Sequence, residues 1–172
     1  MESNKSIFKS NLLNSLLFSY ILIINIFNAQ ESTAKNQENK DIPKVFSYRS
    51  ASCGCCKKWV NNLRNNGLRV VDNIVEDISE IKNQYNVPNN LRSCHSAKIG
   101  KYTIEGHVPI ESINKLFKEK PSISGIAVPG MPHGSPGMET HSHKSLSHNY
   151  ETYEVFSFSN NGNTKIFSQI SP

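Results

Sequence analysis

Three cysteines stand within four residues of this chain, and no other feature limits its fold so strongly. The cluster Cys53–Cys56 follows a short apolar stretch at 45–48 and precedes a segment with helical periodicity. In that segment the apolar positions recur at i, i+3, i+4 and i+7, as Cys56, Trp59, Val60 and Leu63. We therefore expect the cluster at the N-terminus of a helix, where exposed N–H groups and the helix dipole favour the thiolate form of cysteine.

Periodicity and turn residues divide the following chain into short strands and helices. The strands are expected over 45–48, 68–74, 91–97 and 102–105. The helices are expected after the cysteine cluster as far as Gly67, from Asp77 to the pair Val87-Pro88, and from Pro109 to Pro121. This βαβαββα order is that of the thioredoxin-like α/β fold, and it would put Pro88 at the position of that fold's cis-proline.

The C-terminal part of the chain adds a short strand, an irregular loop and a β-hairpin. The strand is expected over 126–128 and the hairpin over 153–158 and 164–167. Between them, proline and glycine exclude regular structure from 129–138, and a polar stretch follows over 140–150. This region holds two methionines and four histidines: Met131, Met138, His133, His141, His143 and His148.

The N-terminal residues have the layout of an export signal. Two lysines precede an apolar stretch over 12–27, and small residues at 32–34 suit signal peptidase. We therefore divide the chain into a signal peptide or uncleaved N-terminal anchor (1–34), a disordered linker (35–43) and a metal-binding domain of thioredoxin-like type (44–170). The domain is expected to work in the periplasm or elsewhere in the bacterial envelope.

The charge of the chain argues against a nucleic-acid partner. Its formal net charge is +5, from 19 basic and 14 acidic residues, but the basic residues are scattered and form no run. They are expected on solvated faces. Contact with a membrane is expected only through an uncleaved leader.

Several side chains outside the cluster are also ligands for soft metals. Cys94 and His95 are adjacent on an expected strand, and His107 precedes an expected helix. Met131 and Met138 lie in the irregular loop, where core packing does not explain them. Thiolate and thioether ligands select Cu(I), with zinc as the next candidate. The sequence therefore predicts a copper site, with zinc as the less favoured occupant.

Two other arrangements of the cysteines are weighed against a copper site. Structural disulfides would pair Cys53 with Cys56 and leave Cys55 to pair with Cys94, but they give the methionines no role. A single zinc ion usually takes two separated pairs of ligands, which would leave one clustered cysteine unused. Three thiolates this close together can instead bridge neighbouring Cu(I) ions, which predicts a polynuclear site.

A set of motifs in this chain resembles those of one bacterial family. The matching motifs are Tyr48-Arg49-Ser50, Cys53-Gly54-Cys55-Cys56-Lys57-Lys58-Trp59, Val87-Pro88, Ser93-Cys94-His95-Ser96-Ala97, Glu105-Gly106-His107-Val108-Pro109, Ala127-Val128-Pro129-Gly130-Met131-Pro132 and Gly134-Ser135-Pro136-Gly137-Met138-Glu139. The family is that of CopG-like periplasmic copper-resistance and predicted metal-binding proteins, formerly described as a domain of unknown function. The resemblance covers residues 44–167.

This resemblance implies a thioredoxin-like fold, an exported location and copper handling. It also implies metal binding at the four cysteines and at neighbouring histidines and methionines, namely Cys53, Cys55, Cys56, Cys94, His95, His107, Met131 and Met138. The chain departs from the family pattern at Ala51-Ser52, where proline is usual, and this departure removes no expected ligand.

Two functions of different classes follow from these residues. The favoured hypothesis is a binding protein without turnover, which captures Cu(I) for sequestration or resistance and exchanges it with other periplasmic copper-handling proteins. The alternative is an enzyme, a thiol–disulfide oxidoreductase with Cys53 as nucleophile and Cys56 as resolving thiol. The adjacent Cys55 argues against the enzyme because a third thiol would trap mixed disulfides. Copper redox coupled to thiol chemistry would combine the two functions.

Overall fold

The computed structural model of the chain describes residues 19–26, 42–139 and 152–171. The chain divides into two units, Met1–Glu38 and Asn39–Pro172, and residues 19–26 of the first unit are helical. Among the residues that the structure describes, no helix is both long and apolar enough to cross a membrane. The leader over 1–34 and the linker over 35–43 remain predictions.

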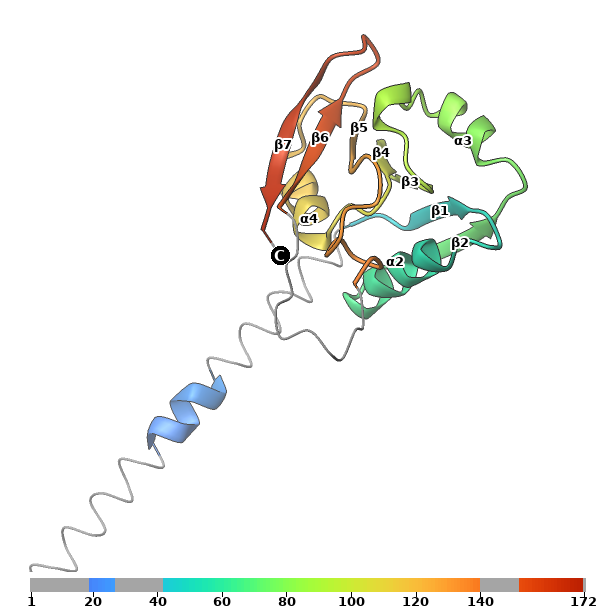
Figure 1. Ribbon diagram of the computed structural model, residues 1–172. Helices are drawn as coiled ribbons and strands as arrows, with labels where there is room; N and C mark the ends of the chain where they lie inside the picture. Colours follow the sequence, from blue (N-terminus) through green and yellow to red (C-terminus); the bar gives the residue numbers. More distant parts are fainter. Residues whose placement is uncertain (1–18, 27–41, 140–151, 172) are drawn as a thin grey trace, which may run out of the picture. The chain divides into compact units, whose positions relative to one another are not determined.

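The second unit is a mixed α/β structure built on a seven-stranded sheet, with the strand order β2-β1-β3-β4-β5-β6-β7 (Figure 1). The strands are β1 (Val45–Arg49), β2 (Val70–Ile74), β3 (Ser96–Ile99), β4 (Tyr102–Glu105), β5 (Gly125–Ala127), β6 (Tyr153–Phe158) and β7 (Thr164–Ile170). The helices are α2 (Gly54–Asn65), α3 (Ile78–Gln84), α4 (Ile110–Glu119) and the short 3₁₀ helix η1 (Asn89–Leu91). The predicted α/β class is confirmed, and so is the C-terminal hairpin, formed by β6 and β7.

Both parallel and antiparallel pairs occur in the sheet. Strand β1 runs parallel to β2 and antiparallel to β3, and β3 runs antiparallel to β4. Strand β5 pairs in parallel with β4, and the hairpin then extends the sheet through antiparallel pairs. The ends of β1 and β4 and the start of β3 therefore lie side by side, because Tyr48 pairs with Ser96 and Ser96 with Glu105.

Helix α2 begins and ends where the sequence predicts. Cys53 is its N-cap residue, with extended backbone angles, and its sulfur accepts a hydrogen bond from the Cys56 N–H. The helix buries Trp59 and Leu63 on the face that its periodicity defines. Gly67 then follows with a φ of +84°, a left-handed conformation that glycine adopts without steric cost.

Helix α3 begins where the sequence predicts but ends at Gln84, before the predicted Val87-Pro88, whereas α4 has both of its predicted ends. The Asp77 side chain accepts a hydrogen bond from the Ser79 N–H at 2.7 Å and caps α3. Pro109 is the N-cap of α4, and Lys120 ends that helix in the left-handed conformation, one residue before Pro121. Local sequence signals are thus sufficient to place these helices along the chain.

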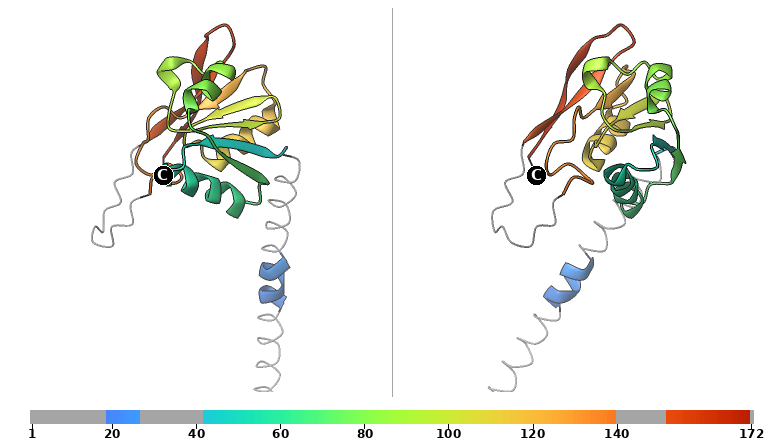
Figure 2. Two further views of the ribbon diagram at one scale, coloured as in Figure 1. Left: turned by 90° about the vertical axis from the view of Figure 1, so that its right-hand side faces the viewer. Right: turned by 45° about the vertical axis from the view of Figure 1, so that its right-hand side comes forward.

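Two apolar cores lie on opposite faces of the sheet. Helices α2 and α4 contribute Leu63 and Leu116 to the larger core, which also includes Ile126 of β5. The neighbouring Ala127 belongs to the smaller core, since successive side chains of a strand point to opposite faces. Helix α3 lies on this second side, against β1 and β3 (Figure 2). The sheet is therefore covered on both faces.

The segment between α3 and β3 differs from the prediction. The expected strand over 91–97 is wrong, because η1 occupies Asn89–Leu91 and β3 begins only at Ser96. The Ser93 N–H donates instead to a side chain, the Glu105 carboxylate, so this residue does not join the strand ladder. The expected cis-proline is also wrong: the peptide bond before Pro88 is trans, and Pro88 is the N-cap of η1.

Replacing Leu63 by alanine should lower the free energy of unfolding by about 2–5 kcal/mol, because it leaves a cavity in the larger core. The matched control is Asn61→Ala on the exposed face of α2, which should change this free energy by less than about 0.5 kcal/mol. Urea denaturation of both variants measures the difference. Equal losses would contradict the packing of α2 on the sheet.

Candidate metal centre

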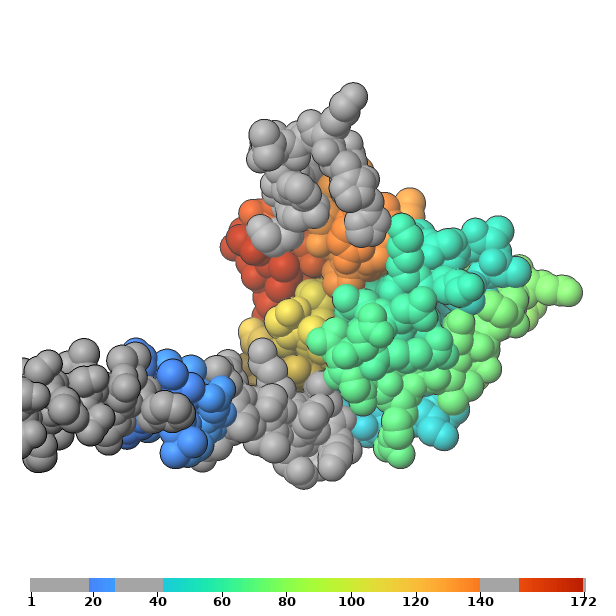
Figure 3. Space-filling view, turned by 90° about the horizontal axis from the view of Figure 1, so that it is seen from below, coloured from blue at the N-terminus to red at the C-terminus, as the bar shows by residue number. Residues whose placement is uncertain are grey.

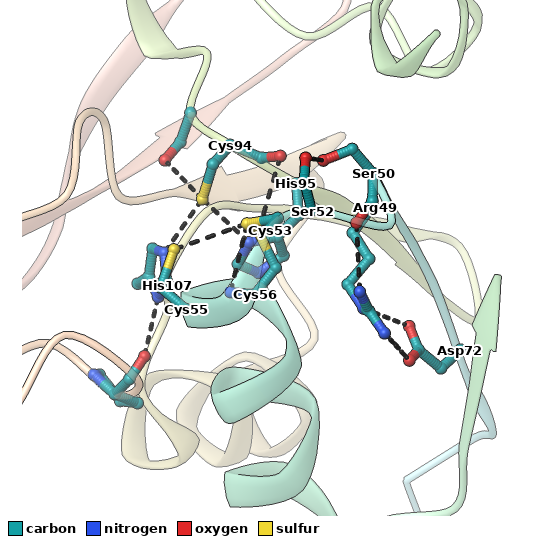
Figure 4. Close-up of a disulfide and its surroundings, with 12 residues drawn as sticks. Arg49, Ser50, Ser52, Cys53, Cys55, Cys56, Asp72, Cys94, His95 and His107 are labelled. Atoms are coloured by element: carbon teal, nitrogen blue, oxygen red, sulfur yellow. Dashed lines mark hydrogen bonds and ion pairs between the residues drawn. A yellow bond between two sulfur atoms is a disulfide. The ribbon is translucent and has the colours of Figure 1, made fainter. Parts of the chain in front are cut away.

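The first part of the candidate site is the N-terminus of α2. Cys53 and Cys56 stand one helical turn apart, with their Cα atoms separated by 5.3 Å, and their sulfur atoms form a disulfide (Figure 4). The Cys56 N–H donates to Cys53 Sγ at 3.3 Å. The bridge that the spacing allows is therefore present, and it lies at the positive end of the helix dipole.

Two free thiols, Cys55 and Cys94, complete this group of cysteines. The sulfur atoms of Cys53 and Cys55 are 3.5 Å apart, and all four cysteine sulfurs lie within 4.8 Å of one another. Because Cys55 and Cys94 are free, the alternative of a second disulfide between them is not realised. Cys94 comes from the loop between η1 and β3, so the fold brings together thiols that are 38 residues apart along the chain.

A second group of ligand atoms shares Cys94 with the first. The Cys94 sulfur lies 3.3 Å from His95 Nδ1 and 3.0 Å from His107 Nε2, and these three atoms also lie within 4.8 Å of one another. His107 stands just beyond the end of β4 and before α4, which brings it next to the loop that holds Cys94. Cys94 is therefore the link between the cysteine cluster and the two histidines.

The tautomer of neutral His107 follows from its second hydrogen bond. Its Nδ1 lies 2.8 Å from the carbonyl oxygen of Pro136, which can only accept, so Nδ1 carries the proton and donates. The Nε2 atom of the neutral ring therefore directs its lone pair toward the Cys94 sulfur. A carbonyl that holds one ring nitrogen in this way is a common means of orienting a histidine that binds metal.

Burial holds the ligands of the second group in their neutral forms. It raises the pKa of Cys94 to about 11, with a further contribution from the neighbouring Cys55. Burial also lowers the pKa of His107. The pair is therefore a neutral thiol and a neutral imidazole, and not the thiolate–imidazolium pair of an activated nucleophile.

His95 is the most enclosed ligand candidate. Its ring is fully buried, with its centroid 4.4 Å from that of Trp59 and 4.9 Å from that of His107. Burial lowers the pKa of His95 well below its ordinary value, and the positive charges near it add to the effect. Its Nε2 atom has no hydrogen-bond partner among the described residues, whereas Nδ1 faces Cys94.

The loop 129–138 lies over the N-terminal part of α2, and in Figure 3 its orange surface adjoins that of the helix. A Cβ atom on Gly137 would lie 2.6 Å from the Cys55 carbonyl oxygen and 3.0 Å from Trp59 N. At the other end of the loop, the Ser93 hydroxyl donates to the carbonyl oxygen of Gly130. The loop is therefore attached to both chain segments that supply cysteines.

The structure brings together six of the predicted site residues, namely Cys53, Cys55, Cys56, Cys94, His95 and His107. The predicted thioether ligands lie in the covering loop, where the Met131 side chain is 51% exposed and Met138 is partly buried. Their ligand role stays a prediction. His133 is exposed in the same loop, and the other loop histidines, at 141, 143 and 148, lie outside the described residues.

Sequence reasoning missed the polar side chains behind the ligands. Arg49 donates to both carboxylate oxygens of Asp72 and to the Ser50 carbonyl, just before the cysteine cluster. Glu105, the first residue of the motif that contains His107, accepts a hydrogen bond from the Ser93 N–H and forms an ion pair with Lys82. A charged residue within an otherwise buried β-strand pattern is the signal that could have identified Glu105.

Comparison with known proteins places these residues in a family context. The family described as "Protein of unknown function, DUF411" matches residues 91–138. This span includes Cys94, His95 and His107 but begins after α2. Two solved structures of the copper resistance protein CopG are also similar. Form 2 is 37% identical, with a TM-score of 0.67, and the match covers 75% of this chain and 99% of that one. Form 1 is 36% identical, with a TM-score of 0.68 and coverages of 77% and 100%. No curated protein matches the chain.

Gly137→Ala should detach the covering loop, whereas Gly130→Ala should not. Both glycines have positive φ values, +90° and +69°, so both variants bear backbone strain, but only the Cβ at Gly137 meets other atoms. Overpacking costs about 1–3 kcal/mol, so alkylation of Cys55 should become roughly tenfold faster in Gly137→Ala. Mass spectrometry of alkylated peptides measures the rate. Equal rates in the two variants would show that the loop does not restrict access to Cys55.

The copper-free protein should lose stability as the pH falls below the ordinary histidine pKa of 6.5. The unfolded chain takes up protons there, but His95 and His107 have lowered pKa values in the folded state, so acid favours unfolding. Below pH 6.5 each histidine adds up to about 1.4 kcal/mol per pH unit to the slope of the free energy of unfolding against pH, and above it the slope is unaffected. Urea unfolding of the wild type and of His95→Phe at several pH values measures the slope. An unchanged slope in the variant would contradict this assignment.

Proposed function

Since the chain belongs to the CopG-like family of copper-resistance proteins, we propose that it binds Cu(I) through its clustered cysteines and the adjacent histidines. One observation carries the proposal: the four cysteine sulfurs lie within 4.8 Å of one another, and Cys94 also contacts His95 and His107. Thiolates and imidazoles are soft or borderline ligands, and soft ligands favour Cu(I). The function is copper sequestration or resistance, without turnover.

More than one copper ion fits the arrangement of the ligands. The two groups share Cys94, and a thiolate in that position can bridge two metal ions. The sulfur atoms of Cys53 and Cys55, 3.5 Å apart, offer a second bridging position. We therefore favour a thiolate-bridged polynuclear site, with Met131 and Met138 of the covering loop as further, thioether ligands.

Use of Cys53 and Cys56 as copper ligands requires reduction of their disulfide before copper enters. An external dithiol adds two electrons and two protons to the Cys53–Cys56 bond, yields two thiols and is itself oxidised to a disulfide. Each thiol that then binds Cu(I) loses its proton to solvent. Because the pKa of Cys94 is about 11, this thiol is protonated at neutral pH and releases a proton on binding. Copper affinity should therefore rise with pH.

The location and the finer fold class belong to the same proposal. The β1-to-α4 order, with β1 between parallel β2 and antiparallel β3, supports a thioredoxin-like arrangement that β5, β6 and β7 extend. The lysines and apolar residues of segment 1–34 support export to the periplasm. Other copper-handling proteins of that compartment are the proposed donors or acceptors of the metal.

A thiol–disulfide oxidoreductase is the second candidate, because the structure has a Cys53–Cys56 disulfide at a helix N-terminus. That position lowers the pKa of a thiol and suits an attacking group. One feature counts against it. The free Cys55 lies 3.5 Å from Cys53, where it can intercept a mixed disulfide.

Copper analysis of the reduced protein, prepared without oxygen, tests the proposal. The wild type should hold one or more copper ions per chain, and Cys55→Ser should lose most of this copper because it removes a central thiolate. The matched control is Ser52→Ala, a nearby exposed hydroxyl that is not an expected ligand. Copper-free wild type, or a single tightly held zinc ion, would contradict a Cu(I) site.

The same variant separates the two candidate functions. Cys55→Ser retains Cys53 and Cys56, so a simple exchange reaction of that pair with a dithiol should survive while copper binding fails. Wild-type turnover as a disulfide reductase, unaffected by Cys55→Ser and accompanied by no copper binding, would favour the enzyme.

A further inference from the structure

A buried carboxylate lies directly behind the loop that supplies Cys94 and His95. Glu105, at the end of β4, is fully buried, and its Oε1 atom accepts from the Ser93 N–H at 2.6 Å. Its Oε2 atom accepts from the Ser96 hydroxyl at 2.5 Å. Ser93 and Ser96 are the residues immediately before and after the Cys94-His95 pair, so one carboxylate holds this pair from both sides.

The backbone of the same region completes the attachment. Ser96 is the β3 partner of Glu105 in the sheet, and the Gly106 N–H donates to the His95 carbonyl oxygen at 2.9 Å. The Glu105 carbonyl oxygen accepts from the Val128 N–H, at the start of the covering loop. Glu105 is therefore in contact with the Cys94 loop and with the entry to the 129–138 loop, and it precedes His107 by two residues.

Lys82 of α3 is the counter-ion of this carboxylate. Its side chain is 5% exposed, and its Nζ donates to Glu105 Oε1 at 2.5 Å and to the Ser96 hydroxyl at 3.1 Å. Desolvation makes such a pair weak as a source of net stability, although loss of one partner leaves a buried charge. Stability alone therefore does not account for a charged pair in this place. The pair does impose a directed geometry, because all three donors converge on one carboxylate.

We infer that Glu105, with Lys82 as its counter-ion, is a positioning residue that holds Cys94 and His95 against the cysteine cluster. The inference rests on the proposed function for its purpose, since the geometry it maintains is that of the metal ligands. Glu105 itself acts only through the loop. Without the carboxylate, the Ser93 N–H and the Ser96 hydroxyl lose a shared acceptor, and the Cys94 loop is free to move away from His107.

The test compares variants whose loops should loosen with a variant that loses a buried hydroxyl elsewhere. Ser96→Ala removes one of the two attachments and leaves the Lys82–Glu105 pair in place. The double variant Glu105→Leu with Lys82→Met removes the acceptor of both hydrogen bonds and the two charges together, so that no charge is left unpaired. The matched control is Ser112→Ala, since Ser112 is also buried and its hydroxyl contacts that of Ser168 at 2.9 Å, in α4 and β7.

The first measurement is the alkylation rate of Cys94 in the reduced, copper-free chain, resolved from the other cysteines by peptide mass spectrometry. Loss of a hydrogen bond to a charged group should accelerate this reaction roughly ten- to a hundredfold in the double variant. Ser96→Ala should give a smaller acceleration, and Ser112→Ala none. If the double variant does not fold, Ser96→Ala alone decides. A Cys94 rate that equals the wild-type rate in the folded variants would overturn the inference.

The second measurement is X-ray absorption of the protein loaded with Cu(I), which counts nitrogen and sulfur ligands. The loosened variants should lose nitrogen ligands and the Cys94 contribution, while Ser112→Ala keeps both. An unchanged ligand count would also overturn the inference. If the wild type binds no copper, the proposed function fails, but the alkylation rates still test the positioning role.

Discussion

The contact of the Cys94 thiol with His107 Nε2, at 3.0 Å, is the interaction on which the site depends. It joins the loop before β3 to the turn after β4, and the same sulfur lies beside the cysteines at the N-terminus of α2. The Cys94 sulfur is also the atom that the two ligand groups share. Two hydrogen bonds hold the partners of this contact in place: His107 Nδ1 donates to the Pro136 carbonyl oxygen, and the Ser93 N–H donates to the Glu105 carboxylate.

Desolvation keeps both the thiol and the imidazoles of this site neutral, although it shifts their pKa values in opposite directions. It raises the pKa of the Cys94 thiol and lowers those of His95 and His107, so each group is neutral when no metal is bound. A buried site of this kind bears no unpaired charge until a cation arrives and displaces a proton. The same neutrality makes Cys94 a poor nucleophile at neutral pH. Chemistry that depends on a reactive thiolate is therefore disfavoured at Cys94.

The disulfide and the proposed copper site share the sulfur atoms of Cys53 and Cys56. While Cys53 and Cys56 are bonded to each other, their sulfurs are not available as thiolates, and only Cys55 and Cys94 are free. Reduction changes the number of available thiols from two to four without requiring a change in the path of the backbone, since the four sulfurs already lie together. In the proposed function, the redox state of the compartment therefore controls how much copper the protein can hold.

Much of the fold could be predicted because its signals are local. Apolar spacing at Trp59 and Leu63, the cap at Asp77, the turn at Gly67 and the prolines that flank α4 act within a few residues of their own positions. The strand expected over 91–97 failed for the opposite reason. Ser93 makes its hydrogen bond to a side chain 12 residues away, and short-range patterns do not contain that partner.

The sequence by itself determined the kind of chemistry, because thiols, imidazoles and thioethers are soft ligands wherever the chain places them. It also placed the cysteine cluster at the start of a helix, since capping and periodicity depend on neighbouring residues. Only the tertiary structure decided which ligands meet. Cys94 reaches the cluster because β3 pairs with both β1 and β4, and His107 is oriented by a carbonyl 29 residues away. The pairing of Lys82 with Glu105 could likewise not be predicted from the sequence, because the contacts that stabilise two buried charges come from distant segments of the chain.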